Sequence, residues 1–166
     1  MGTIQVDFQL PRKFDLTYMD KDGELKTPVM IHHVIYGSLE RFIGLLIENT
    51  AGRFPFWLSP VQVGIVPVGE KNNQYAHQVA EKLRYNRIRV EVDDRDNPIG
   101  TKIRKIREEL LPYIVIVGDK EEAEGTLSIR VRSADQVHGV PVERFVEATN
   151  RMNREREYDL QDEFDK

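Results

Sequence analysis

The sequence contains no cysteine among its 166 residues. This absence excludes disulfide bonds, thiol catalysis and zinc ribbons, and it fits a reducing cytoplasm. The sequence also has no run of roughly 18 apolar residues, the length that a membrane helix needs. Its first residues lack the basic and then apolar layout of a signal peptide. We therefore expect a cytoplasmic chain with no membrane partner.

Several well-known catalytic motifs are also missing. The sequence has no Walker loop, no Gly-x-Ser-x-Gly elbow and no Gly-x-Gly-x-x-Gly turn. No pair of carboxylates stands out as an acid and a base. The stretch PVGEKNNQ, which follows an expected strand, has one glycine and no phosphate-cradling pattern. That disfavours a flavodoxin-like ligand binder.

Charge is distributed unevenly along the chain, whose formal net charge is −4. The last twelve residues hold six acids and two bases, so they alone sum to −4. The segment Arg84–Arg107 holds eight bases and four acids, a net charge of +4. A phosphate-facing surface and a solvated helix face laced with ion pairs both fit this segment.

Residues 1–50 have the pattern of a small antiparallel structure. Ile4, Val6, Phe8 and Leu10 alternate with polar residues, which predicts a half-buried strand. Two further runs flank an Asp22-Gly23 turn and predict a hairpin, with the second run from Val29 onward. A helix is expected from Ser38 to a stop near Gly52. Three strands and one helix bury themselves poorly, so this part reads as a piece of a larger antiparallel sheet.

Residues 61–154 have the pattern of a complete α/β domain. Four expected strands alternate with amphipathic helices, which predicts right-handed crossovers and a largely parallel sheet. YIVIVG, apolar throughout, is expected as a central strand. A Pro- and Gly-containing linker is placed at 51–60 and an acidic tail at 155–166. The four strands are expected within residues 61–68, 88–92, 113–118 and 126–133.

One candidate anion site lies in the segment 93–110. Asn97 is expected to cap a helix with Pro98 in its first turn, and Lys102, Arg104 and Lys105 follow within two turns. A well-capped surface helix whose bases pair with nearby acids fits the same pattern. Both readings stay open on the pattern alone.

A second candidate lies around IHHVIYGSLERF, residues 31–42. His32 and His33 would point to opposite faces of a strand, so at most one is a metal ligand there. With no cysteine and no third clustered donor, the chain cannot build a tetrahedral zinc site by itself. Arg41 is suited to clamping a phosphate, or equally to pairing with Glu40 or Glu48.

Four stretches, taken in order, closely resemble the threonyl-tRNA synthetases, a family of class II aminoacyl-tRNA synthetases. The resemblance implies that residues 1–50 are the carboxyl-terminal remnant of the catalytic domain, with its third motif, GSLER. It also implies that residues 61–154 are an anticodon-binding domain, a five-stranded mixed sheet with three helices. The stretches are GTIQVDFQLPRKFDL, PVMIHHVIYGSLERFIGLLIEN, AGRFPFWLSPVQV and RIRVEVDDRDNPIGTKIRKI followed by PYIVIVGDKE.

The same resemblance assigns roles to individual residues. It places Arg41 against ATP, Gln5 and Ser38 in the pocket for threonine and its adenylate, and His32 among three zinc ligands. The other zinc ligands and the first two class motifs are absent from this chain. The chain alone is therefore expected to be inactive and to hold no zinc, ATP or Mg²⁺ tightly. The anticodon-loop candidates are Asn97, Lys102, Arg104, Glu121 and Arg130.

Two positions depart from the family pattern. His33 stands where the family usually has arginine, and Pro98 stands where many relatives have a lysine. The second departure removes one expected anticodon contact.

The predicted function is binding of the anticodon loop of threonine tRNA. The whole enzyme would attach threonine to that tRNA with ATP, as a homodimer. The alternative is a non-catalytic accessory module, derived from a synthetase, that binds a protein or another RNA.

Overall fold

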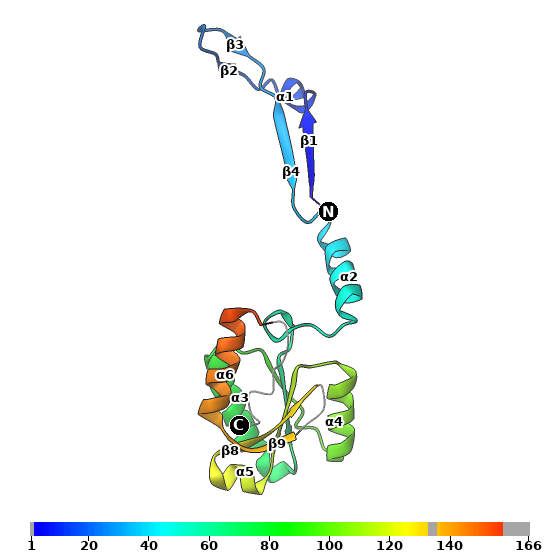
Figure 1. Ribbon diagram of the computed structural model, residues 1–166, viewed down its shortest axis with the longest axis vertical. Helices are drawn as coiled ribbons and strands as arrows, with labels where there is room; N and C mark the ends of the chain where they lie inside the picture. Colours follow the sequence, from blue (N-terminus) through cyan, green and yellow to red (C-terminus); the bar gives the residue numbers. More distant parts are fainter. Residues whose placement is uncertain (1, 133–135, 158–166) are drawn as a thin grey trace. The chain divides into compact units, whose positions relative to one another are not determined.

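The computed structural model describes residues 2–132 and 136–157, which form two compact units, Met1–Asn49 and Thr50–Lys166 (Figure 1). Most of the predicted acidic tail, from residue 158 to residue 166, lies outside the described residues. No helix of the described part is long and apolar enough to cross a membrane.

The first unit contains a two-stranded antiparallel ladder. Strand β1 (Thr3–Asp7) pairs with β4 (Met30–Val34), and Gln5 lies directly opposite His32. Residues that face each other across a ladder share one face of the sheet. Gln5 and His32 therefore lie on one face, while His33, opposite Ile4, lies on the other. The prediction that the two histidines point apart is confirmed.

A short helix and a hairpin connect these strands. Helix α1 (Leu10–Lys13) begins where the Asp7 carboxylate accepts the backbone N–H groups of Gln9 and Leu10, at 2.7 and 2.9 Å. The hairpin pairs β2 (Tyr18–Met19) with β3 (Leu25–Lys26) around Gly23, whose φ of 76° suits glycine. The run from Val29 onward, expected as an arm of this hairpin, pairs with β1 instead.

The first unit leaves large apolar side chains uncovered. Ile4 and Ile31 are 71% and 66% exposed, and Phe14 and Leu39 are exposed to a similar degree. Helix α2 (Leu39–Thr50) follows β4 and is amphipathic, as its spacing predicts. Apart from Pro11, all buried apolar residues of the described chain belong to the second unit. The first unit therefore has no closed core of its own.

A five-stranded sheet organises the second unit. The strand order is β6-β5-β7-β8-β9. Strands β6 and β7 run parallel to β5, whereas β8 and β9 are antiparallel to their neighbours. The mixed sheet implied by the family resemblance is confirmed, and the largely parallel sheet expected from the pattern is wrong for these last two strands. The bounds are β5 Val63–Pro67, β6 Val90–Val92, β7 Tyr113–Val117, β8 Thr126–Val131 and β9 Gln136–Pro141.

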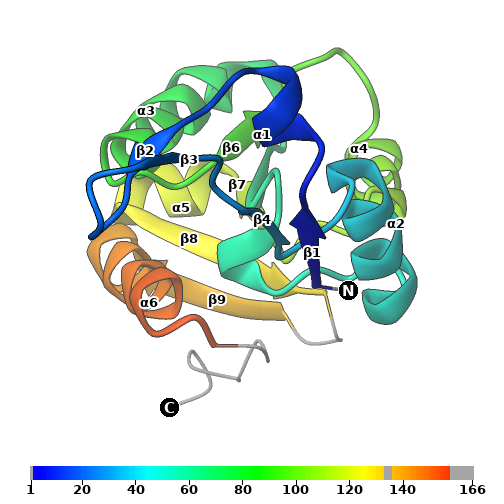
Figure 2. The same ribbon diagram turned by 90° about the horizontal axis from the view of Figure 1, so that it is seen from above.

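The helices cover the two faces of this sheet unequally. Helices α3 (Asn73–Tyr85) and α6 (Val142–Glu155) lie on one side and α4 (Ile99–Glu108) lies on the other (Figure 2). The crossover from β5 to β6 and the crossover from β6 to β7 run in opposite directions, and right-handed connections then place their helices on opposite faces. A short helix, α5 (Asp119–Glu124), was not predicted, because its residues are almost all charged. Single turns form at η1 (Phe56–Leu58) and η2 (Glu70–Asn72).

Strand β7 is buried on both faces, as expected for a central strand. On the α3 and α6 side, Tyr113, Val115 and Val117 join the larger apolar cluster. On the other side, Ile114 and Ile116 pack in a smaller cluster with Ile106 of α4. The buried members of this smaller cluster come from α4, β5, β7 and the turn after α4.

Segment 51–60 is fastened to the second unit. Phe56 is 1% exposed and its ring lies 5.6 Å from that of Tyr113. The buried Gln62 amide donates to the carbonyl of Phe56 at 2.8 Å. The Arg89 guanidinium donates to the carbonyls of Trp57 and Ser59. The expected linker is thus packed against the second unit.

Gly64 allows α4 to approach β5 closely, and this contact is testable. A Cβ at Gly64 would lie 2.9 Å from Cγ2 of Ile106 and 3.1 Å from Cδ2 of Leu111. We predict that Gly64→Ala lowers the free energy of unfolding by about 1–3 kcal/mol through overpacking. Urea denaturation followed by circular dichroism measures this change.

Gly100 of α4 provides the control. A Cβ there would meet no atom within 4 Å, so Gly100→Ala should leave the stability unchanged or raise it by up to about 1 kcal/mol. Equal effects of the two substitutions would show that the contact at Gly64 is not tight.

Candidate functional site

The side of β8 that faces away from α3 and α6 carries polar side chains. Leu127, Ile129 and Val131 enter the larger apolar cluster, so the alternation of the strand turns Ser128, Arg130 and Arg132 to the opposite face. Cross-strand pairing agrees, because Ser128 lies opposite Ile116 and Arg130 lies opposite Ile114. These residues form a polar face of the sheet, on which Ser128 is buried and Arg130 and Arg132 are half-buried.

Glu121 reaches this surface from α5 and is held there by hydrogen bonds. Its Oε1 accepts the Ser128 hydroxyl at 2.6 Å, and its Oε2 accepts the Gly118 N–H at 3.1 Å. Ser128 Oγ also lies 2.7 Å from Nδ1 of His138 on β9. Because the single hydroxyl proton goes to Glu121, Nδ1 of His138 is the donor in that pair. Two strands and one helix therefore fix the orientation of the carboxylate.

The environment keeps Glu121 ionised. Burial alone would raise the pKa of this carboxyl. The hydrogen bonds from Ser128 and from the backbone N–H groups of Glu121 and Gly118, together with His138, outweigh burial and lower the pKa. The group therefore presents a charged acceptor at neutral pH, suited to the N–H donors of a base edge.

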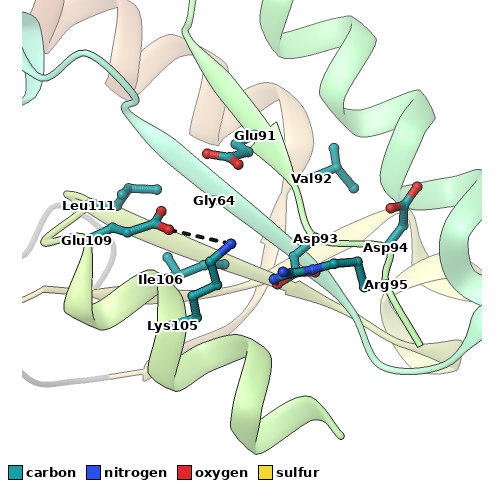
Figure 3. A pocket seen from close by; sticks show the side chains of 10 residues that line it. All are labelled: Gly64, Glu91, Val92, Asp93, Asp94, Arg95, Lys105, Ile106, Glu109 and Leu111. Carbon is teal, nitrogen blue, oxygen red and sulfur yellow. Dashed lines mark hydrogen bonds and ion pairs between the residues drawn. The ribbon is translucent and has the colours of Figure 1, made fainter. Parts of the chain in front are cut away.

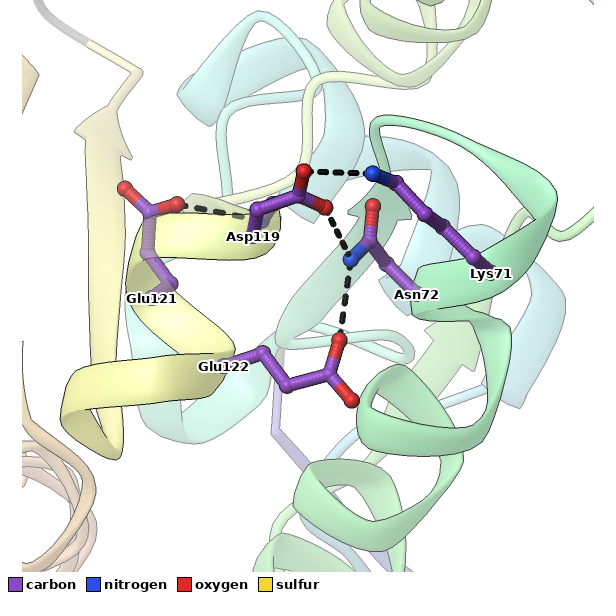
Figure 4. Close-up of polar contacts among 6 residues, drawn as sticks. Lys71, Asn72, Asp119, Glu121 and Glu122 are labelled. Carbon is purple, nitrogen blue, oxygen red and sulfur yellow. Dashed lines mark hydrogen bonds and ion pairs between the residues drawn. The ribbon is translucent and has the colours of Figure 1, made fainter.

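Polar side chains join the segments that follow β5 and β7. Asp119 accepts hydrogen bonds from Lys71 at 2.5 Å and from Asn72 at 3.0 Å, and Asn72 also donates to Glu122 at 2.9 Å (Figure 4). Doubly wound sheets often bind ligands at such a switch of direction. Here the ion pair and hydrogen bonds instead anchor α5, which carries Glu121.

The remaining anticodon-loop candidates lie on or before α4. Asn97 is exposed but does not cap the helix: α4 begins at Ile99, and Pro98 occupies the N-cap position, so the predicted cap is wrong. The geometry favours Pro98 there because its φ of −54° and ψ of 137° are extended. Arg104 is exposed and lies 3.4 Å from Glu108, a pairing the alternative reading anticipated.

Lys102 differs from the other candidates because its side chain is buried. It is 5% exposed, and its Nζ donates to the carbonyl of Pro67 at 3.4 Å. Its charge also helps to lower the pKa of Asp93, although the hydrogen bond from Arg95 is the largest cause. The sequence pattern did not indicate that Lys102 is buried. A lysine stem can lie along an apolar surface with its charged end directed elsewhere, so a lysine does not by itself mark an exposed position.

A cavity of about 300 Å³ between β6 and α4 has charges that are mostly paired with one another (Figure 3). Arg95 binds Asp93 through two hydrogen bonds, at 2.7 and 2.5 Å, and Lys105 lies 3.7 Å from Glu109. Glu91 and Asp94 also line it. With its bases engaged and further acids present, this cavity is poorly suited to an anion.

The first unit brings together two of its four predicted site residues. Gln5 and His32 line a common open pocket, and neither Ser38 nor Arg41 lines it. His32 Nε2 lies 3.3 Å from Oδ2 of Asp7. Ser38 directly precedes α2: its hydroxyl donates to Glu40 at 2.7 Å and accepts the Arg41 N–H at 3.3 Å.

The residues around His32 do not make a metal site. Within residues 2–132 and 136–157, no group of three or more His, Asp or Glu side chains is placed to hold a metal ion. Asp7, the acid nearest His32, already accepts two backbone N–H groups, and these bonds are the largest causes of its lowered pKa. This donor set does not fit a bound zinc ion.

Sequence reasoning missed Ser128 and His138, which orient Glu121. The alternation of TLSIRVRS was the available signal, since it places Ser128 on the same face as Arg130. His138 could not be found in this way, because its strand was not predicted.

Comparison with known families covers both units. Residues 62–152 match the model of the anticodon-binding domain, and residues 1–50 match the class II tRNA synthetase core domain of the G, H, P, S and T enzymes. A crystal structure of the RNA-binding domain of threonyl-tRNA synthetase from Cryptosporidium parvum superposes with a TM-score of 0.76. It is 34% identical and covers 91% of this chain and 38% of its own.

Curated relatives agree with this comparison. The chain is 50% identical over 146 residues to the threonine–tRNA ligase of Caldanaerobacter subterraneus, covering 88% of this chain and 23% of the relative. It is 48% identical over 161 residues to the ligase of Clostridioides difficile, covering 97% and 25%. The chain thus spans about a quarter of the length of these relatives. It belongs to the anticodon-binding domain family, and the members that it resembles across both units are threonyl-tRNA synthetases.

Proposed function

We propose that this chain binds the anticodon loop of threonine tRNA on the open face of β8 and β9. The observation that carries the proposal is the oriented Glu121 carboxylate, fixed by Ser128 and by the Gly118 N–H on a polar sheet surface. Unstacked bases of RNA loops are read by hydrogen bonds to their edges, and arginine holds phosphates or stacks on bases. Arg130 lies on this same surface, two residues beyond Ser128.

The other candidates take different roles in this proposal. Asn97 and Arg104 are exposed before and on α4, where they can contact RNA directly. Lys102 acts by supporting the ends of β5 and β6, because its ammonium group is directed to Pro67 and towards Asp93.

The activity of the longer enzyme is part of the same proposal. It would attach threonine to tRNA with ATP and Mg²⁺, as a cytoplasmic homodimer. Residues 1–50 would belong to its catalytic domain and residues 61–154 would form the anticodon-binding domain. Residues 51–60 would be the linker between the two. The missing catalytic sequence would cover the exposed apolar side chains of the first unit. In that domain Arg41 would meet ATP, Gln5 and Ser38 would line the threonine pocket, and His32 would supply one zinc ligand.

The accessory-module alternative has no comparable support. The curated relatives cited above are ligases, and the matched models are synthetase domains. The surface expected for RNA is polar and arginine-bearing rather than apolar.

The first experiment measures anticodon preference. The purified chain should bind a threonine anticodon stem-loop more tightly than the same RNA with a changed anticodon. Glu121→Gln should reduce this preference roughly tenfold, because one base-edge contact contributes about 1–3 kcal/mol of discrimination. Fluorescence anisotropy at two salt concentrations measures both affinities.

Glu124→Gln is the matched control, since it makes the same change on the exposed end of α5. It should leave the preference intact. Equal affinity of the unmodified chain for the two RNAs would contradict the proposed anticodon reading.

The second experiment separates Lys102 from Arg104. Lys102→Ala should lower the free energy of unfolding by about 1–2 kcal/mol, because a buried side chain and its hydrogen bond are lost. Arg104→Ala should leave stability within about 0.5 kcal/mol and weaken RNA binding. Thermal melting and RNA titration of both variants measure these effects. An unchanged melting temperature for Lys102→Ala would show that its burial contributes nothing to stability.

A further inference from the structure

A second cavity in the anticodon-binding unit is lined by four arginines. It has a volume of about 240 Å³, and Arg53, Arg107, Arg130 and Arg132 surround it together with apolar residues of β7, β8 and the turn after α4. The arginines come from four separate places: segment 51–55, the last turn of α4, the middle of β8 and the residue that follows β8. Of the four, the sequence analysis named Arg130 as an anticodon-loop candidate and counted Arg107 only among the bases of the segment Arg84–Arg107.

The charges in this cavity are not neutralised by the protein. No carboxylate lines it among the described residues. Within residues 2–132 and 136–157, the side chains of Arg53, Arg107 and Arg130 form no ion pair or hydrogen bond. Only Arg132 is engaged, donating to the carbonyls of Phe54 and Leu110 at 3.1 and 3.0 Å. Desolvation and the neighbouring Arg53 lower the pKa of Arg132. Positive charge is thus concentrated where an anion would relieve the repulsion.

The contrast with the cavity between β6 and α4 is informative. That cavity contains Arg95 and Lys105 but also the acids that bind them. Here the fixed partners of Arg132 are backbone carbonyls, which hold the guanidinium in place without cancelling its charge. The cavity is thus shaped and positive before any ligand arrives.

We propose that the cavity lined by Arg53, Arg107, Arg130 and Arg132 binds a backbone phosphate of the RNA whose bases meet Glu121. This inference rests on the proposed function. The cavity lies below the usual range of about 300–1,000 Å³ for drug-sized ligands. Guanidinium groups suit phosphate oxygens because they donate paired, charge-assisted hydrogen bonds.

The position of Arg130 links the cavity to the base-reading surface. Arg130 lines the cavity, and Ser128, the hydrogen-bond donor to Glu121, lies two residues earlier on the same face of β8. Two residues of a strand span about 7 Å. One RNA strand can therefore place a phosphate in the cavity while a neighbouring base reaches Glu121. Phosphate contacts set register and carry no sequence information directly.

The test uses Arg53 and Arg107, which line the cavity and are exposed. Arg53→Gln and Arg107→Gln, singly and combined, are titrated with the threonine anticodon stem-loop and with the same RNA carrying a changed anticodon. The double variant should bind both RNAs roughly tenfold more weakly. The slope of log affinity against log salt should become less steep by about 0.7 for one phosphate contact on a single strand.

Arg154→Gln is the matched control, because it removes the same charge from α6, which packs on the opposite face of the sheet. The inference is overturned if the double variant matches this control in affinity and salt slope, or if the unmodified chain binds neither RNA. It is also overturned if inorganic phosphate, titrated by calorimetry, binds the unmodified chain but not the double variant while RNA affinity stays the same. That result would assign the cavity to free phosphate.

The two proposals fail separately. Equal affinity of the unmodified chain for both RNAs, with equal losses in the double variant, would refute anticodon reading and support the phosphate contact. If the unmodified chain prefers the native anticodon and the double variant loses no affinity, anticodon reading is supported and the phosphate contact is refuted.

Discussion

The alternation of strand β8 between two environments is the constraint on which the candidate site depends. Leu127, Ile129 and Val131 are held in the large apolar cluster with α3 and α6. This burial fixes the register of the strand, because a slip by one residue would bring arginine into the core. The face opposite is therefore specified as strictly as the core itself. It receives Ser128, Arg130 and Arg132, where α4 no longer covers the sheet.

The segment before β5 contributes Arg53 to the arginine-lined cavity. Turns and hydrogen bonds hold this segment in place. Gly52 and Ala51 have positive φ values, 74° and 49°, and turn the chain after α2. Arg132 then binds the Phe54 carbonyl, while Gln62 and Arg89 hold the turn at η1. The same guanidinium that secures this segment also contributes charge to the arginine-lined cavity. Arg132 thus both holds this segment in place and adds positive charge to the cavity.

The sequence predicted those elements whose side chains show a clear period. The stripes of α3, α4 and α6 and the continuous apolar run of β7 are found where expected. Strand β9 was missed by the pattern because QVHGVP includes Gly139, at a φ of 70°, and pairs with β8 across an irregularity between Leu127 and Ile129. Helix α5 was missed because its residues are nearly all polar, and Asn72 holds it in position by donating hydrogen bonds to Asp119 and Glu122. These contacts are long-range, and no local pattern contains them.

The distribution of charge along the chain differs from the distribution of charge in the folded structure. The net charge of +4 over Arg84–Arg107 suggested a basic surface, yet Arg95, Arg104 and Lys105 each lie beside an acid, and Lys102 is buried. The concentrated positive charge instead comes from Arg53, Arg107, Arg130 and Arg132, which are separated by up to 79 positions in the sequence (132 − 53). A charge that is scattered along the chain can be concentrated by the fold, and a charge that is concentrated along the chain can be neutralised by it. The electrostatic field at this cavity is therefore set by the sheet topology, which brings the end of β8 beside the end of α4 and the segment before β5.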